Sequence, residues 1–447
     1  MKHSFLLLFV VLASTALQAQ ETPNQFSLLE AIDYALAHNR QVKNAARDID
    51  IAKKQKWETT ATGLPQISAA VDYQSWIKQQ VSLLPAEIAG GQPGTFVPVT
   101  FSPKQSLNAT ATLNQLIFDG SYLVALQSAK VFLEISKNAK IKTDLEVRNA
   151  VINAYGNVLL AEENLDIVLK NIAVLEKNLK ETTKIFENGL TEEESVEQLQ
   201  ITLTGLQNYL NNVERSKNIA YQLFNITLGI DLNEPLTLTD TLETLTLQNI
   251  SLDLLTANDN VENSIDYQIA KNQEETAALF LKLERSTFLP RLSAFINAGY
   301  SGFGETFNFT SSNQAWYGSS LFGVNMSIPI FSSGMRKAAT QRAKIDLEIA
   351  KEELTETEQQ LKFQISAAKS DYQFAIEEYQ NKRQNLNLAE RIEQKNQTKF
   401  FEGIASSFDL RQAQTQLYAA QQEYLQSMFD VITKKSALET ILNTVNY

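Results

Sequence analysis

The sequence predicts a mixed α and membrane-β fold, in which a two-fold internally repeated chain carries four transmembrane β-strands plus long coiled-coil helices. Three observations support this prediction. The same motifs occur twice in the same order, four short segments alternate apolar and polar residues, and the long stretches that remain have helical spacing. The 447 residues include only 16 glycines and 9 prolines, which favours long uninterrupted elements.

Residues 1–20 have the layout of a secretory signal peptide. A short basic start is followed by an apolar stretch from Phe5 to Ala13 and then by small residues, with cleavage expected near Ala19 or Gln20. A membrane anchor is the less favoured alternative, because the apolar run is shorter than the ~20 residues that a spanning helix needs. The chain has no cysteine, which excludes disulfides, thiolate catalysis and lipidation of a cysteine after the signal.

Several segments of the first half return in the second half. The matching pairs are GLPQISAAVDY (63–73) with FLPRLSAFINAGY (288–300), LNQLIFDGSYLVALQSAK (113–130) with MSIPIFSSGMRKAATQRAK (326–344), and FENGLTEEESV (186–196) with FFEGIASSFDL (400–410). We therefore predict one duplicated structural unit, with a first repeat over 21–226 and a second over 263–447. Between them, residues 227–262 are rich in Leu and Thr. We interpret them as an equatorial linker segment, a small mixed element packed outside the helices, with a flexible linker as the alternative.

Four segments have the period of two that is typical of a strand with one apolar face. They lie at about 65–78, 105–118, 291–302 and 317–331, so each half contributes a pair. The connecting segments 79–104 and 302–316 are rich in Gly, Pro, Ser and Asn and are predicted to be loops. The expected lipid face consists of Ile67, Ala69, Val71, Leu107, Ala109, Leu113, Leu292, Ala294, Ile296, Phe322, Val324 and Met326.

Each strand pair is followed by a stretch with helical spacing. Residues 104–234 and 330–447 contain no proline, and their apolar residues step by three and four positions, as in coiled coils. Glycine is the preferred residue for a left-handed helix C-cap, so Gly189 and Gly403 are predicted to end one helix just before the next begins. Each half is thus a strand pair, a long helix, a tight turn near 189 or 403, and a returning helix.

The composition disfavours several classes of function. A net charge of -12 argues against a nucleic-acid partner. After signal removal His38 is the only histidine, and we expect it to have a surface or packing role. The sequence contains no catalytic constellation and no Gly-rich phosphate loop, so we expect no enzymatic activity, cofactor or metal.

Amphipathic strands in an exported protein without a helical span indicate a β-barrel, because only helices and closed barrels satisfy the backbone in lipid. Four strands cannot close into one, since bacterial barrels have at least about eight. Several chains must therefore share a barrel. The alternative from these features is a soluble coiled-coil protein with a small sandwich.

The duplicated layout resembles the TolC family of outer-membrane efflux channels, over essentially the whole mature chain. The residues that carry the resemblance are Leu64-Pro65 and Leu289-Pro290, Ile117-Phe118-Asp119-Gly120 and Ile330-Phe331-Ser332-Ser333-Gly334, and the turns at 186–196 and 400–410. The resemblance implies a homotrimer in the cell outer membrane of a Gram-negative cell, with a 12-stranded barrel and a periplasmic α-helical tunnel. It implies a passive exit duct of a tripartite efflux or type I secretion system. Such a duct receives substrate from an inner-membrane transporter and a periplasmic adaptor (membrane fusion) protein.

The resemblance also implies two groups of site residues near the inner mouth of the tunnel. The pore aperture would comprise Asp409, Gln412, Glu194, Ser195 and Phe400. The adaptor-docking tips would comprise Gly189, Leu190, Gly403 and Ile404. Three copies of Asp409 would form a ring of negative charge, and the alternative is that Asp409 only caps a helix.

This sequence departs from the family pattern around the expected ring. Ser195 stands where the first half could carry an acid, and Gln412 stands where a second acid is common. Ala405 replaces an Arg that can lock the aperture, and Phe400 replaces a Tyr that can hydrogen-bond. We therefore expect a thinner ring and a less firmly latched closed state.

Two functions without transport stay open as alternatives: a structural periplasmic coiled-coil protein and a surface adhesin. Heat-resistant trimers from outer membranes would favour the duct, and a soluble periplasmic monomer would favour the coiled coil. Cell binding through 79–104 would favour the adhesin. The sequence does not choose the cargo, because ducts of similar sequence carry antibiotics, metal ions, siderophores or polypeptides.

Overall fold

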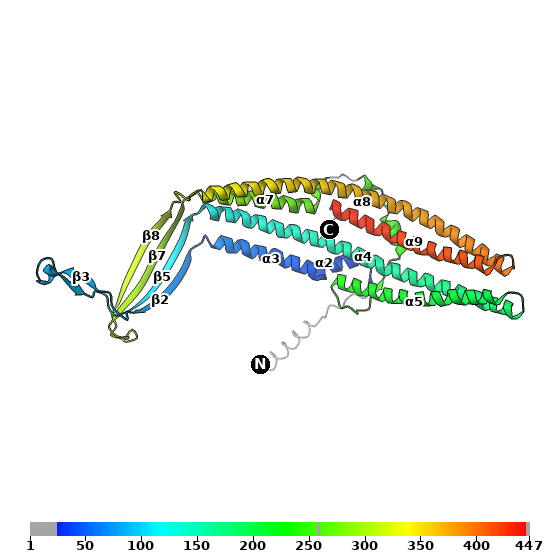
Figure 1. The fold of residues 1–447 in the computed structure, drawn as a ribbon, viewed down its shortest axis with the longest axis horizontal. Helices are drawn as coiled ribbons and strands as arrows, with labels where there is room; N and C mark the ends of the chain where they lie inside the picture. Colours follow the sequence, from blue (N-terminus) through cyan, green and yellow to red (C-terminus); the bar gives the residue numbers. More distant parts are fainter. Residues whose placement is uncertain (1–24, 257–259, 444–447) are drawn as a thin grey trace, which may run out of the picture. The chain divides into compact units, whose positions relative to one another are not determined.

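The computed structural model describes residues 25–256 and 260–443, and Figure 1 shows its elements along the chain. The expected signal peptide, 1–20, lies outside the described residues. The chain divides into two compact units. The strand unit comprises Asp50–Ile135 and Asn272–Glu352, and the helical unit comprises the other described residues.

A four-stranded antiparallel sheet, in the order β2-β5-β7-β8, is the centre of the strand unit. Its members are β2 (Gln66–Ser75), β5 (Gln105–Phe118), β7 (Arg291–Gly304) and β8 (Trp316–Ser327). The pairing of β5 with β7 joins the strand pair of the first half to that of the second. Four strands form where the sequence predicts them, but the fourth was predicted to reach 331 and ends at Ser327. Pro329 lies just beyond this end, because proline cannot donate to the ladder.

Segment 79–104 differs from the predicted loop, because it contains a two-stranded ribbon. In this ribbon β3 (Ser82–Pro85) pairs antiparallel with β4 (Phe96–Val99), and the 3-10 turn η1 (Ala86–Ala89) follows β3. The sequence shows no alternation here, because apolar residues occupy both faces of both strands. The corresponding connection of the second half, 305–315, contains only turns and bends.

Each half contributes a long helix and a returning helix. The long helices are α4 (Gly120–Glu187) and α8 (Met335–Phe401), with 68 and 67 residues. The returning helices α5 (Glu193–Leu228) and α9 (Ser407–Leu442) both have 36 residues. Helices α3 (Arg40–Ala61) and α7 (Ile265–Ser286) precede the strand pairs. The near-equal lengths confirm that the fold is duplicated.

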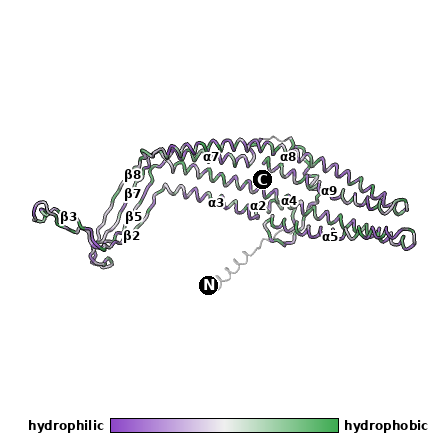
Figure 2. The backbone as a smooth tube through the Cα atoms, viewed as in Figure 1, coloured by the Kyte–Doolittle hydropathy of each residue, from purple (hydrophilic) through white to green (hydrophobic). Residues whose placement is uncertain are grey.

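None of the helices within 25–256 and 260–443 is long and apolar enough to cross a membrane. Figure 2 shows why, since hydrophilic and hydrophobic residues are mixed along α4 and α8.

Two buried tyrosines organise the core of the helical unit. Tyr155 on α4 donates its hydroxyl to the backbone oxygen of Phe26 at 3.0 Å and to Oδ2 of Asp240 at 2.8 Å. Tyr372 on α8 donates to the backbone oxygen of Asn249 at 2.6 Å. Burial raises the pKa of both hydroxyls, so both remain protonated donors.

The segment between α5 and α7 packs against this core. It contains β6 (Thr237–Leu238), α6 (Leu242–Asn249) and the 3-10 turns η2 (Asp253–Leu255) and η3 (Val261–Asn263). Strand β6 pairs in parallel with β1 (Gln25–Phe26), which precedes the first helix α2 (Leu28–His38). Helix α6 lies against α9, and Leu236, Leu242 and Leu245 are buried core residues of the helical unit.

A single glycine interrupts α4, and the structure gives its reason. A Cβ atom at Gly156 would lie 2.8 Å from the ring of Phe429 on α9. Such a distance is too short for any real contact, so α4 and α9 can approach at this level only where no side chain intervenes.

Candidate functional site

The register of the sheet brings the whole expected lipid face to one side. Ile67 lies opposite Leu113, Leu113 opposite Ile296, and Ile296 opposite Phe322, so one apolar row crosses all four strands. The other residues of the expected lipid face lie an even number of positions along their strands from this row, so their side chains are on the same face. Side chains that alternate along paired strands share a face when they are paired. The sheet therefore has one mainly apolar face, which Gln115 and Ser320 interrupt, and its aliphatic and aromatic side chains are largely exposed.

The opposite face of the sheet is mostly polar. Its middle row contains Ser68, Thr112 and Asn297 and ends at Leu321 on β8. The side-chain amide of Asn297 donates to Oγ1 of Thr112 at 2.7 Å across the strands. An amphipathic sheet of this kind suits a wall with lipid on one side and water on the other.

Both edges of this sheet are open. Within the described residues β2 pairs only with β5, and β8 pairs only with β7. Each edge strand presents unpaired backbone N–H and C=O groups over its whole length, which proteins normally cover or blunt. The sheet is thus an incomplete surface whose edges can accept further strands.

Aromatic side chains gather at the end of the sheet that carries the connecting segments. The ring of Tyr73 lies 5.6 Å from that of Phe307 and 6.1 Å from that of Phe309, between ring centroids. The ring of Phe309 lies 6.4 Å from that of Trp316. Aromatic girdles of this composition are typical of strand ends at a membrane–water interface.

The two helical turns have the same local geometry. Gly189 and Gly403 have φ angles of 73° and 74°, in the left-handed region that favours glycine. Leu190 donates its N–H to the oxygen of Ile185 at 3.0 Å, and Ile404 donates to that of Lys399 at 2.8 Å. Both turns are therefore Schellman C-caps.

The residue after each glycine is apolar and points to solvent. Leu190 is 77% exposed and Ile404 is 72% exposed. Schellman motifs frequently cover this side chain against the helix that they end. The exposure of both leaves two apolar projections, one at each turn.

The returning helix α9 begins with a capping box. The carboxylate of Asp409 accepts the Ser406 hydroxyl at 2.6 Å and the Ser406 backbone N–H at 2.9 Å. The Ser406 hydroxyl in turn accepts the Asp409 backbone N–H at 3.2 Å. The side-chain bond and then the backbone bond lower the pKa of the Asp409 carboxyl, which is exposed and ionised.

Helix α5 begins differently. Its N-cap, Glu192, makes no side-chain capping bond. Ser195 occupies the position that corresponds to Asp409, but it is buried, with its hydroxyl 3.4 Å from that of Thr191. Glu194 is exposed and its carboxylate accepts the amide of Gln198 at 2.7 Å.

A groove between the two turns brings together some of the expected site residues. Glu194, Ser195, Phe400, Leu190 and Gly403 all line it. Asp409 and Gln412 do not, and both are exposed on α9. The structure thus joins the two turns through residues from both halves of the chain.

Three amide pairs that sequence reasoning missed connect α4 to the second helical hairpin. Gln422 donates to Asn164 at 2.6 Å, Asn171 donates to Gln421 at 2.8 Å, and Gln397 donates to Asn178 at 3.0 Å. Asn and Gln occur throughout both helices, so nothing in the sequence distinguishes these six residues. The pairs fix the two hairpins to each other along their length.

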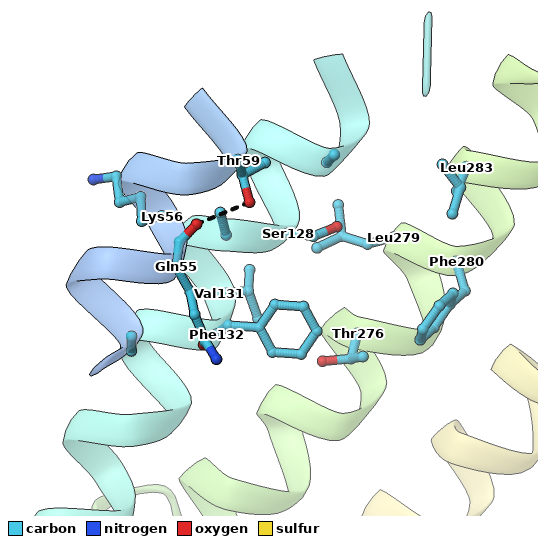
Figure 3. A pocket seen from close by; sticks show the side chains of 13 residues that line it. Gln55, Lys56, Thr59, Ser128, Val131, Phe132, Thr276, Leu279, Phe280 and Leu283 are labelled. Carbon is cyan, nitrogen blue, oxygen red and sulfur yellow. Dashed lines mark hydrogen bonds between the residues drawn. The ribbon is translucent and has the colours of Figure 1, made fainter. Parts of the chain in front are cut away.

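The strand unit also contains an apolar cleft between α3, α4 and α7 (Figure 3). Ala52, Ala129, Phe132 and Phe280 are among its lining residues, and Lys56 is its only charged one. The Thr59 hydroxyl is bonded to the backbone oxygen of Gln55 at 3.0 Å. The lining holds no acid–base pair.

The described residues contain no group of three or more His, Asp or Glu side chains that could hold a metal ion. The ring of His38 stacks on that of Tyr34, with centroids 4.0 Å apart, and its Nδ1 lies 3.0 Å from the Tyr34 oxygen. His38 therefore makes a packing contact with Tyr34.

The chain is similar in sequence to outer membrane proteins over most of its length. It is 20% identical to Outer membrane protein TolC of Vibrio cholerae over 424 residues, which cover 94% of this chain and 91% of that protein. It is 23% identical to Probable efflux pump outer membrane protein TtgC of Pseudomonas putida over 413 residues, which cover 92% of this chain and 81% of that protein.

Solved structures share the fold. CusC has a TM-score of 0.74 at 17% identity, covering 93% of this chain and 91% of that one. VceC from Vibrio cholerae has a TM-score of 0.72 at 18% identity, covering 93% and 95%. The sequence profile described as Outer membrane efflux protein matches residues 31–226 and 258–444. The chain therefore belongs to the outer membrane efflux protein family.

Proposed function

We propose that three copies of this chain form a passive outer-membrane exit duct. The observation that carries the proposal is the open, amphipathic sheet with two free edges, in a member of the outer membrane efflux protein family. Three such sheets, joined edge to edge, would make a closed barrel of twelve strands with its apolar face toward lipid. Among the proteins named above, TtgC is described as a probable efflux pump outer membrane protein, and the CusC structures are described in terms of transmembrane channel formation.

We propose that the duct works with an inner-membrane transporter and a periplasmic adaptor in a tripartite efflux or type I secretion system. The adaptor would dock on the turns at Gly189, Leu190, Gly403 and Ile404. The exposed apolar side chains of Leu190 and Ile404 support this assignment, because such projections suit a protein partner. The duct itself would use no energy source.

The pore aperture is proposed to lie at the starts of the returning helices, with Asp409 as its main charged group. Exposure and ionisation of Asp409 support the proposal, and its capping bonds to Ser406 show that it has a structural role as well. Glu194 would add charge from the other turn, while Gln412, Ser195 and Phe400 would line the aperture without charge.

Membrane fractionation followed by native mass spectrometry tests the proposed function. We expect the mature chain in the outer membrane, as a particle of three copies that survives extraction in mild detergent. A soluble periplasmic monomer would instead support the structural coiled coil. A surface protein of another stoichiometry that binds cells would support the adhesin.

A further inference from the structure

The ribbon formed by β3 and β4 has one face that is entirely apolar and uncovered. The register pairs Leu83 with Pro98 and Pro85 with Phe96, so these four side chains share a face. All four are exposed in the chain, Leu83 by 67% and Phe96 by 61%. We call this set the ribbon face. An isolated two-stranded ribbon is marginally stable in water, so an uncovered apolar face indicates a partner.

The tip of the ribbon holds this face in a fixed shape. Ala86 donates its N–H to the oxygen of Thr95 at 2.9 Å, and Gly91 donates to that of Ala86 at 2.7 Å. The carboxylate of Glu87 accepts the Gly94 N–H at 3.2 Å. Because the tip satisfies its own hydrogen bonds, the ribbon face is built before any partner arrives.

Lipid is a poor candidate for the cover of the ribbon face. The aromatic cluster around Tyr73 and Trp316 lies at the end of the sheet, where a girdle would meet the membrane surface. The last backbone hydrogen bond beyond β2 and β5 joins Trp76 to Lys104 at 2.9 Å. Figure 1 shows that the ribbon continues outward from this end of the sheet. The ribbon face is therefore in the aqueous region beyond the girdle.

A second copy of the same chain is a good candidate. Residues 76–104 contain only three charged side chains, Lys78, Glu87 and Lys104, so copies of the ribbon can converge with little repulsion. Twelve strands spaced ~4.8 Å apart and tilted by ~40° give a barrel about 12 Å in radius. One arm of the ribbon, residues 79–85 before the 3-10 turn, can extend up to about 23 Å, which is enough to reach the barrel axis.

We propose that the three ribbons of one trimer pack against each other through the ribbon face, above the outer mouth of the duct. This inference rests on the trimer of the proposed function. It assigns to segment 79–104 an interface between copies of this chain, with Leu83, Pro85, Phe96 and Pro98 buried around the three-fold axis. The shorter connection 305–315 of the second half would leave room for the three ribbons.

Cysteine cross-linking tests this interface directly, because the chain has no cysteine of its own. Leu83→Cys places a thiol on the ribbon face, and Ser82→Cys places one on the preceding residue of β3, which is also exposed but on the other face. The variants are oxidised in isolated outer membranes and separated without reductant. We expect Leu83→Cys to give at least ~10-fold more covalent dimer than Ser82→Cys, because a disulfide needs Cβ atoms about 4 Å apart.

The three-fold arrangement makes the expected band pattern specific. One disulfide can join only two of three thiols, so the third chain should stay uncross-linked, and a trifunctional maleimide should convert all three to one band. Phe96→Cys and Val97→Cys repeat the comparison on β4, where only Phe96 lies on the ribbon face.

Each other outcome overturns the proposal. Equal cross-linking of Leu83→Cys and Ser82→Cys would mean that the ribbons meet without using this face. An adduct with a protein of another mass would identify a different partner. A fluorophore can be attached to the thiol of the Leu83→Cys variant. If brominated lipid quenched its fluorescence, the membrane would be the cover of the ribbon face. An intact trimer without any cross-link would overturn this inference alone, whereas absence of the trimer in native mass spectrometry would overturn the proposed function as well.

Discussion

Replacing Val324 with arginine tests which face of the sheet meets lipid. Val324 lies on the apolar face of the edge strand β8, opposite Ala294, and is 55% exposed in the chain. Val324 lies between two and three residues from the middle of β8. With ~3.3 Å per residue and a strand tilt of ~40°, and with the middle of β8 at the midplane of the bilayer, Val324 lies about 6 Å from that midplane. An arginine costs ~2–4 kcal/mol at the midplane and less toward the interfaces, so we expect about 2 kcal/mol per chain.

A trimer contains three copies of the substitution, which together destabilise it by about 6 kcal/mol. Asn325→Arg is the matched control, because Asn325 is the next residue of the same strand, faces the other way and lies opposite Ser293. Its arginine would stay in water. The assay is the fraction of chain that runs as trimer after extraction from outer membranes. Val324→Arg should abolish most of the trimer and Asn325→Arg should leave it, whereas equal losses would refute the assignment of the lipid face.

Five further substitutions, two of which are controls, test the helical unit. Gly403→Val forces a β-branched residue into a left-handed conformation, so the turn should distort. The variant should still reach the outer membrane, but efflux, measured as resistance or secretion, should fail. Unchanged efflux would contradict the assignment of this turn as a docking site. Asp409→Asn should weaken cation preference and block by multivalent cations in planar bilayers, whereas Ser406→Ala, which removes the cap and keeps the charge, should preserve both. In the unsubstituted protein the block by multivalent cations should persist as pH falls through the ordinary carboxylate range, because Ser406 lowers the pKa of Asp409. If a folded Asp409→Asn variant showed unaltered block, Asp409 would be a helix cap and nothing more. Thermal unfolding tests the close approach of α4 and α9. Gly156→Val should destabilise the fold by about 1–3 kcal/mol through overpacking. Gly205→Ala is the control at a helical position where an added Cβ would have no atom within 4 Å, and it should stabilise the fold by about 0.5–1 kcal/mol.

The strands and turns could be predicted because their signals are local. Alternation in β2 or β8 is visible within ten residues of sequence, and the glycines at 189 and 403 mark left-handed caps that few other residues tolerate. The register itself could not be predicted. The match of Ile67 to Leu113 and of Leu113 to Ile296 depends on pairing between segments that are far apart in the chain.

The β3–β4 ribbon could not be predicted for a different reason. Its strands are apolar on both faces and carry prolines at Pro85 and Pro98, so they lack the period of two and contain residues that usually indicate a loop. The contacts of α4 with α9 were equally hidden, since helical spacing identifies a buried stripe but not the helix that covers it.

At the candidate aperture, the spacing of six positions from Gly403 to Asp409 is not the only pattern in the sequence that predicts local structure. The Ser406-x-x-Asp409 pattern is itself a capping-box signature. That pattern predicts the hydrogen bonds that the structure contains. The groove lined by Glu194, Ser195 and Phe400 could not be found in this way, because it brings the two halves together.

Single-channel recording in planar lipid bilayers tests most directly whether the chain forms a passive duct. Purified trimer, with no nucleotide and no partner protein, should insert and give discrete steps of ionic current that are carried by the trimer alone. Val324→Arg, purified as monomer, should give none. A purified trimer that binds the bilayer but never conducts, in either polarity and over a range of salt, would contradict the account.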